Sequence, residues 1–375
     1  MQKGSFRRIY ALVIKEYRQI RRDSSTLLIA FVLPLILLFI YGYGISLDIT
    51  NMKISCVMED RNSDSMSFMQ TLSHSPFFSI TYVDNAEKMG QDISSGKSLG
   101  GIIIPSYFSD FKENPFQVAP IFVVADGSQP NTASFVQNYV SAAFSIWQQE
   151  KNIEEGKSSL PIVEVVPRFW YNEELNSHHF LIPGSIAIIM TLIGTILTAL
   201  VIAREWERGT MEALMATPIT LFEILAGKLI PYFILGFLSM FICTVISCTI
   251  FSVPFRGSLL ALSIVTSIFL LSALGLGLLI SSATRNQFNA SQIALVTAFL
   301  PAFMLSGFIF EITSMPMRIQ FLTYLIPARY MVSSLEAIFL VGDVPSLLRI
   351  NCFAMALFAV ILFSIFFLKS TKRLD

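Results

Sequence analysis

The chain has 375 residues, of which 54% are hydrophobic and only 14% are charged, whereas soluble domains carry roughly 25% charged residues. Basic and acidic residues are equal in number, so the net charge indicates no nucleic-acid partner. Of the four cysteines, Cys243, Cys248 and Cys352 lie in long apolar segments, and Cys56 has no other cysteine near it in the sequence. This arrangement is not typical of a disulfide framework or a metal cluster. The composition is typical of a protein that lies in a lipid bilayer.

Residues 1–24 predict a cytoplasmic amphipathic helix that lies in the headgroup layer of the bilayer, with basic residues on its polar face. The apolar side chains that recur at spacings of three and four residues are Phe6, Ile9, Tyr10, Val13, Tyr17 and Ile20. A plain basic anchor that only orients the next segment is the alternative, and both interpretations can hold together.

Six apolar segments are long enough to cross about 30 Å of hydrocarbon. They are residues 27–47, 180–203, 229–255, 257–284, 287–310 and 350–368. The first segment, placed at 25–47 with its flanking polar residues, is too long for a cleaved signal peptide, so we interpret it as an uncleaved anchor. None of the six contains Asp, Glu, Lys, Arg or His, so the segments predict no proton or ion path.

Lysine and arginine are concentrated at one side of these segments. Residues 1–23 contain seven of them, and residues 204–228 and 369–375 contain three each. Because cytoplasmic loops carry the excess of basic residues, both termini are predicted to be cytoplasmic. We therefore expect a polytopic α-helical membrane protein with six transmembrane helices.

Residues 48–179 have the composition of a soluble domain, and short apolar runs alternate with helical patterns. The predicted strands are 54–58, 78–83, 101–104, 121–125 and 162–166, and the predicted helices are 65–72, 86–94 and 132–150. This alternation predicts an extracytoplasmic α/β domain, inserted between the first and second transmembrane helices. In a bacterium, this domain would be periplasmic.

Two segments resemble a phosphate-binding loop and a metal site at first sight, but their spacing and position favour a structural role. Residues 90–98 resemble a phosphate-binding loop, but five residues rather than four separate Gly90 from Gly96, and the segment ends a predicted helix. The adjacent His178 and His179 would point apart, which favours a structural role over a metal site. No catalytic arrangement is found, so the sequence predicts neither an enzyme nor a cofactor or metal site in this chain.

Residues 180–375 hold the remaining five transmembrane segments and one unusual region, 311–349. This region has two short apolar stretches, 319–326 and 330–341, separated by Pro327. Each is too short to cross a bilayer, so they predict re-entrant or interfacial half-helices. An ordinary extracytoplasmic loop is the alternative.

Residues 204–218 follow the second transmembrane segment and alternate acidic and basic side chains. Thr210 can cap a short helix with Met211, Leu214 and Met215 on one face, and Pro218 ends it. That spacing fits a helix that docks in a groove of a partner protein. A solvated turn is the alternative.

Here a resemblance to a known family becomes specific. The segment 204–228 resembles the hallmark of type-2 ABC exporter permeases, and 324–330 and the order of all the parts are similar as well. The match is closest to bacterial inner-membrane drug-efflux permeases with an inserted periplasmic domain. The residues that this resemblance assigns to coupling with an ATPase are Glu205, Glu207, Arg208, Gly209, Thr210, Met211, Glu212, Leu214 and Met215.

The resemblance implies a cytoplasmic ABC ATPase that binds ATP and Mg²⁺ and receives the helix at 210–217 in its groove. It also implies a second permease, of the same or a related chain, and it leaves room for a periplasmic adaptor protein. The expected function is a permease that exports drugs or lipid-like amphiphiles across the bacterial inner membrane. A membrane-anchored binding or assembly protein that acts through its periplasmic domain is the alternative.

Overall fold

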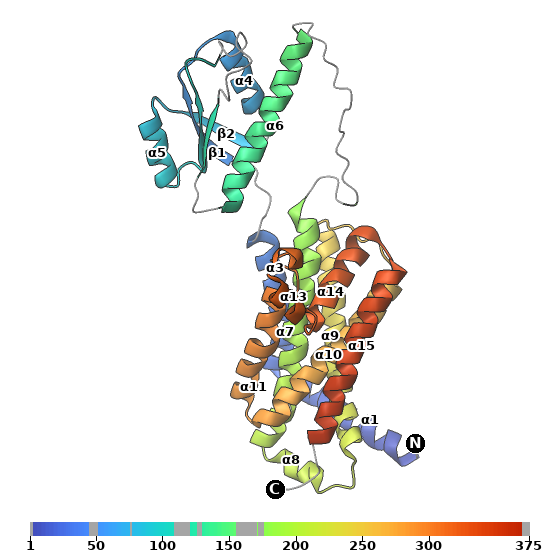
Figure 1. Cartoon of the computed structure of the whole chain (residues 1–375). Coiled ribbons are helices and arrows are strands. Elements are labelled where there is room, and N and C mark those ends of the chain that lie inside the picture. Colours follow the sequence, from blue (N-terminus) through green and yellow to red (C-terminus); the bar gives the residue numbers. More distant parts are fainter. Residues whose placement is uncertain are drawn as a thin grey trace. The chain divides into compact units, whose positions relative to one another are not determined.

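The computed structural model describes residues 3–44, 52–75, 77–108, 121–125, 130–154, 171 and 176–369. The chain forms two compact units (Figure 1). We call Leu47–Pro167 the inserted unit, and Met1–Ser46 together with Arg168–Asp375 the membrane unit. The inserted unit thus interrupts the membrane unit after its first long apolar helix.

The inserted unit is built on a four-stranded sheet of order β2-β1-β3-β4. The central strand β1 (Met52–Met58) pairs in parallel with β2 (Phe78–Tyr82) and with β3 (Gly100–Ile104). The edge strand β4 (Phe122–Ala125) runs antiparallel to β3. Four of the predicted strands are confirmed, and the fifth, at 162–166, lies outside the described residues.

Helices cover both faces of this sheet. The long helix α6 (Pro130–Glu154) packs beside α4 (Ser63–His74) on one face, and α5 (Ala86–Ser94) covers the other. Side chains of β1 alternate accordingly, because successive residues of a strand point to opposite faces. Cys56 is buried in the core under α4 and α6, whereas Val57 packs with Met89 of α5.

The membrane unit contains six helical segments that are long and apolar enough to cross a membrane, as the sequence predicted. Three are single helices: α7 (Ser177–Glu207), α9 (Leu221–Thr249) and α10 (Leu259–Thr284). A fourth is α15 (Pro345–Lys369). The other two contain a π-helical turn and comprise α2 (Ser24–Leu27), η1 (Leu28–Val32) and α3 (Leu33–Gly44), and then α11 (Gln287–Ala294), η3 (Leu295–Phe299) and α12 (Leu300–Leu305).

The third segment differs most from its predicted bounds, 229–255. It begins at Leu221, because Thr220 and Glu223 form a reciprocal capping box that satisfies the free amides of the first turn. It ends at Thr249, shortly before Ser252, whose φ of 53° is incompatible with a continuing helix. The fifth segment ends at Leu305 instead of 310, with Gly307 at a φ of 92°.

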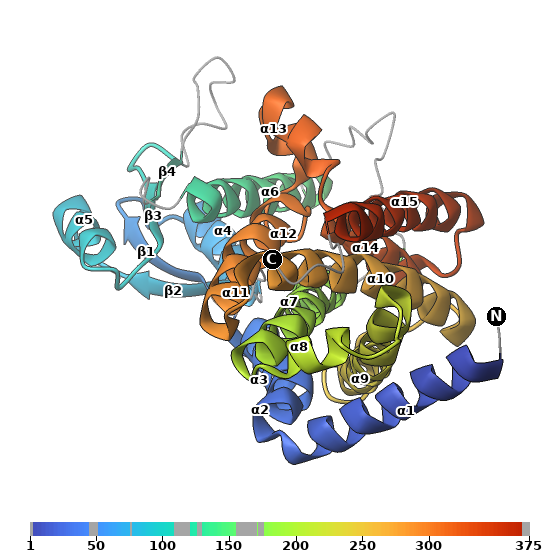
Figure 2. The same ribbon diagram turned by 90° about the horizontal axis from the view of Figure 1, so that it is seen from below.

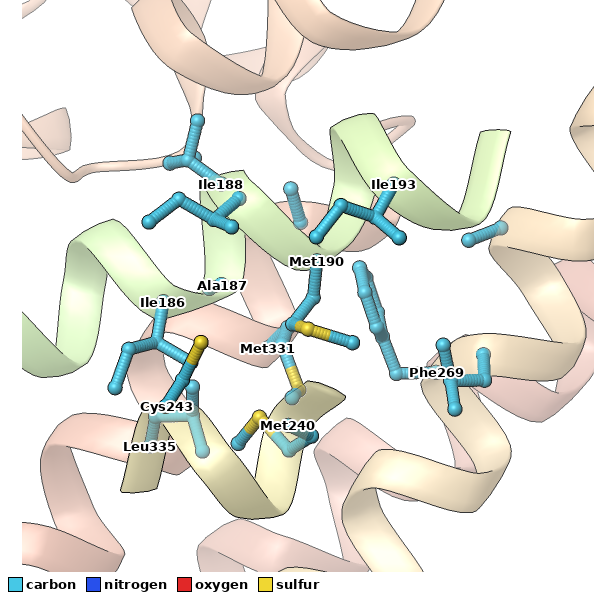
Figure 3. Packing of buried hydrophobic residues seen from close by; sticks show 14 of the residues in the cluster. Ile186, Ala187, Ile188, Met190, Ile193, Met240, Cys243, Phe269, Met331 and Leu335 are labelled. Carbon is cyan, nitrogen blue, oxygen red and sulfur yellow. The ribbon is translucent and has the colours of Figure 1, made fainter. Parts of the chain in front are cut away.

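The central helix of the membrane unit is α7. Of its most apolar 18 residues 94% are buried, against 22–56% in the other five segments. Figure 3 shows its side chains Ile186 and Met190 among those of α9 and α10 and of the short helix α14 (Pro327–Glu336). Gly194 lies so close to α10 that a Cβ there would be 2.9 Å from the Cβ of Ala273, since small residues let helices approach.

Residues 311–349 contain a sharply bent pair of helices. The short 3-10 turn η4 (Ile312–Ser314) precedes α13 (Met317–Thr323), and α14 continues into the π-helical η5 (Ala337–Val341). The axes of α13 and of α14 with η5 differ by 85°. Two short helices therefore replace a straight span here, and their depth in a bilayer stays a prediction.

Helix α1 (Lys3–Arg22) lies across the end of the bundle, where Figure 2 shows it lengthwise while α7 and α9 are seen nearly end-on. Its buried face differs from the predicted apolar face: Leu12, Glu16 and Ile20 are buried, and Leu12 packs closely on Gly227 of α9. Phe6, for example, is 75% exposed. Some side chains of the predicted apolar face are therefore buried and others are exposed, because α9 covers only one side of α1.

Candidate functional site

A buried ion-pair cluster joins α1, α7 and α9 at this end of the bundle. The Nζ of Lys228 lies 2.8 Å from Glu16 Oε1 and 2.8 Å from Glu205 Oε1, and all three residues are at most 3% exposed. Lys15 adds a second cation, 3.1 Å from Glu205. The Thr210 hydroxyl donates to the other carboxylate oxygen of Glu205. Buried charges are stable only when they are paired and hydrogen-bonded, and this cluster meets both conditions.

A second ion pair links α7 to the start of the first apolar segment. Arg204 forms a salt bridge to Asp23 and also donates to Gln287 Oε1 at 3.3 Å. Partial burial alone would raise the pKa of Asp23, but the hydroxyl of Thr26 and the guanidinium of Arg204 hold it below its ordinary value. Glu207 accepts a hydrogen bond from the Gln287 backbone amide at 2.7 Å, which fixes the end of α7 against α11.

The start of α9 is tied to the start of α1. Glu223, which closes the capping box with Thr220, also accepts hydrogen bonds from Arg8 at 2.9 Å and from Ser5. Because Glu223 is only 1% exposed, the pair is shielded on the carboxylate side. Helix α1 is therefore fixed to α9 at two places, near its N-terminus and at Glu16.

The short helix α8 (Thr210–Met215) follows α7 after a reversal of the chain. Gly209 makes this reversal at a φ of 67°, a left-handed conformation that other residues adopt only with strain. Nothing lies within 4 Å of a Cβ built there, so the requirement for glycine comes from the backbone angle. Within α8, Met211 is 5% exposed, Leu214 is half-buried and Glu212 is exposed.

Among the described side chains of the nine residues assigned to coupling, Glu205 and Met211 are buried. Thr210 and Glu207 are exposed, although Thr210 donates to Glu205 and Glu207 accepts from the Gln287 amide. Arg208, Gly209 and Glu212 are also exposed and Leu214 is half-buried, so a partner can reach these six positions. The side chain of Met215 lies outside the described part of the structure. Met211 is buried in the chain alone, so its place on a docking face stays a prediction.

The sequence prediction missed the residues that hold this end together, chiefly Glu16, Asp23, Arg204 and Lys228. It also placed no ionisable group in the apolar segments, whereas α7 includes Arg204 and Glu205, and α9 includes Lys228. A signal was present: Glu16 and Asp23 are the only acids among residues 1–23, which are otherwise basic. A lone acid on the apolar side of a basic helix indicates a buried partner of opposite charge.

Among the described residues no group of three or more His, Cys, Asp or Glu side chains could hold a metal ion. The cluster joins helices that are far apart in the sequence. Its chemistry suits the transmission of a movement from α8 and α1 to α7 and α9.

Comparison with known proteins gives a consistent result. A family model described as ABC-2 family transporter protein matches residues 24–368. YbhS of Escherichia coli (strain K12), a probable multidrug ABC transporter permease, is 50% identical over 99% of this chain and 98% of its own length. YbhR of the same strain, with the same description, is 32% identical over 89% and 90%. The linearmycin resistance permease protein LnrN of Bacillus subtilis (strain 168) is 22% identical over 96% and 98%. These similarities confirm the resemblance on which the sequence analysis relied: the chain belongs to the ABC-2 family of transporter proteins.

Proposed function

We propose that the chain is the permease subunit of an ABC exporter for drugs and other hydrophobic or amphiphilic molecules, driven by a separate ATPase that docks at α8. The ATPase binds ATP and Mg²⁺, and this chain contributes the path through the bilayer. The description of YbhS and YbhR as probable multidrug permeases supports this substrate class. The nearly uncharged interior around α7 supports it as well.

The contact between α8 and the buried ion-pair cluster carries the proposal. Thr210, the first residue of α8, donates to Glu205, and Glu205 shares Lys228 with Glu16 of α1. A displacement of α8 is therefore transmitted to α7, α9 and α1, because separating paired charges in a buried environment costs several kcal/mol of free energy. A partner that acts on α8 would make use of such a linkage, which favours a coupling helix over a solvated turn.

The excess of Lys and Arg in α1 and near α8 supports a cytoplasmic location for this end and for both termini. The inserted unit then lies in the periplasm of a bacterium, where an adaptor protein could engage it. A second permease, identical or related, completes the path in this proposal. Neither the described residues nor the comparisons favour the alternative of a membrane-anchored assembly protein, and the family match extends well beyond the inserted unit.

The test is a charge placed on the free face of α8. Leu214→Asp should abolish copurification of the ATPase and ATP-driven export of a fluorescent drug from inverted vesicles. The reason is that an unpaired charge in a buried contact costs about 3 kcal/mol or more. Membrane abundance should stay normal, because Leu214 is half-buried in the free chain and lies outside the bundle core.

Met66→Asp is the matched control. Met66 is 55% exposed in the inserted unit, so the same change of chemistry there should leave ATPase association and export intact. Full association and full export in the Leu214→Asp variant would refute docking at α8.

A further inference from the structure

A cavity of about 600 Å³ lies in the membrane unit, at the end of the bundle opposite α1 and α8. It is enclosed by the first turn of α7, the turn that follows α12, and α14. Its apolar walls include Phe180, Ile309, Ile312 and Val332. This size and lining suit a drug-sized organic molecule.

Glu336 lines the same cavity from the last turn of α14. Its Oε1 is shielded from solvent and has no hydrogen-bond partner among the described residues. A Cβ added to Gly184 of α7 would lie 3.6 Å from this oxygen and 2.7 Å from the ring of Phe308, so the carboxylate stands in a tight apolar setting. The side chain as a whole is half-buried, with Oε1 directed at α7. An ionised carboxylate that is shielded on one oxygen and has no partner is unfavourable unless a ligand neutralises it.

The neighbouring charges leave this carboxylate uncompensated. Arg329 also lines the cavity, but its guanidinium stacks on the ring of Tyr324, 3.9 Å from the centroid, and donates to the hydroxyl of Thr323. Glu311 is exposed at the rim and accepts from the Thr313 hydroxyl at 2.6 Å. When Glu336 and Glu311 are both ionised, two carboxylates face one engaged guanidinium, and the cavity then has a net negative charge.

The backbone changes its geometry at the same point. The π-helical turn η5 begins at Ala337, the residue after Glu336. Such turns are rare and occur frequently at functional sites. The cavity, the unpartnered carboxylate and the π-helical turn therefore coincide within one turn of α14.

We propose that this cavity binds amphiphilic organic cations, with the cationic centre beside the Glu336 carboxylate and the apolar body against Phe180 and Val332. The inference rests on the proposed export function, for which it names the substrate class at the end of the bundle distant from the ATPase. The carboxylate distinguishes a cation from a neutral molecule of equal size, and the apolar walls distinguish an organic cation from a small hydrated inorganic cation.

The test measures binding of radiolabelled tetraphenylphosphonium to the purified full-length chain in lipid nanodiscs, without the ATPase. We expect saturable binding by the wild type and a loss of about tenfold or more in affinity for Glu336→Gln, because a charged partner is removed without a change of shape. Glu336→Asp, which retains the charge, should restore most of the affinity. Triphenylphosphine oxide, a neutral molecule of similar size, should compete poorly with the wild type.

Glu311→Gln is the matched control, because it removes the exposed carboxylate at the rim and should change the affinity by less than about twofold. The proposal is overturned if Glu336→Gln binds the cation as the wild type does. It is also overturned if the neutral oxide competes as well as the cation, or if sodium displaces the probe at equal concentration. Since no ATPase is present, these outcomes are independent of the Leu214→Asp result, so either proposal can fail alone.

Discussion

The two ends of the membrane unit treat buried charge in opposite ways. At the α1 and α8 end, Glu16, Glu205 and Lys228 are buried together with ion-pair distances of 2.8 Å. At the other end, Glu336 presents a shielded carboxylate oxygen that has no partner among the described residues. Paired charges hold helices in one arrangement, whereas an unpaired carboxylate is stabilised when a ligand of opposite charge binds beside it. In our two proposals the first end transmits a movement and the second binds a ligand.

The largest effect is expected when Lys228, the cation at the end where the charges are paired, is replaced. Lys228→Met leaves Glu16 and Glu205 buried beside each other, with only the half-exposed Lys15 to compensate. We expect the free energy of unfolding to fall by about 3–5 kcal/mol, as when one member of a buried pair is deleted. Thermal unfolding in detergent and the amount of protein in the membrane would measure this loss.

Lys15→Met is the control for that variant, since the Lys15 side chain is 43% exposed and Glu205 keeps Lys228. Its effect should be below about 1 kcal/mol. Equal losses for the two variants would mean that burial does not distinguish these lysines.

A second prediction concerns Glu336, at the end where the charge is unpaired, and here the free energy of unfolding should rise instead of fall. Glu336→Gln should raise the free energy of unfolding by about 1–3 kcal/mol in the absence of ligand, because an unsatisfied charged group is replaced by a neutral one of the same shape. Functional sites often carry such a stability deficit. A fall in the unfolding temperature would show that Glu336 is a structural residue with a stabilising contact.

The smallest expected effect is a pH dependence at Asp23. Its pKa in the folded chain lies below the ordinary value of 3.8, so the salt bridge to Arg204 stabilises the fold above that value and is lost as pH falls through the lowered pKa. Asp23→Asn retains the helix cap and removes the charge. At pH 7 the variant should be less stable by about 1 kcal/mol, because Asp23 is partly exposed and the asparagine oxygen can still accept a hydrogen bond from the buried Arg204.

Unfolding curves recorded between neutral and acidic pH would sharpen this prediction. The difference between wild type and Asp23→Asn should shrink as the acid is protonated, and the two should converge well below pH 3.8. A difference that is constant with pH would exclude the carboxylate charge as its source.

Much of the architecture was readable in the sequence. Long apolar runs predicted six spans, since the thickness of hydrocarbon sets a minimum length that few soluble helices match. Alternating short strands and helices predicted the sheet of the inserted unit, in which four strands were placed within a few residues. Pro327 also indicated the break between α13 and α14, because proline disfavours a helical residue before it.

The candidate sites were only half predictable. Gly209 and Thr210 were assigned to coupling by the family resemblance. The structure makes Gly209 the N-cap of α8 and Thr210 its first residue, whereas the sequence predicted Thr210 as the cap. Lys228 and Glu16 lie 212 residues apart, so no local pattern could pair them. Glu336 was overlooked because a single acid in a short, amphipathic helix resembles an ordinary surface residue.

The sequence by itself determined the membrane class, the number of spans and the order of the parts, because these depend on the length and polarity of local segments. Only the tertiary structure decided which charges are paired. Desolvation depends on everything that surrounds a side chain, and that is set by helices distant in the chain. The same carboxylate chemistry therefore gives a fixed ion pair at Glu205, which meets Lys228 of α9, and an unpaired position at Glu336, which meets Gly184 of α7.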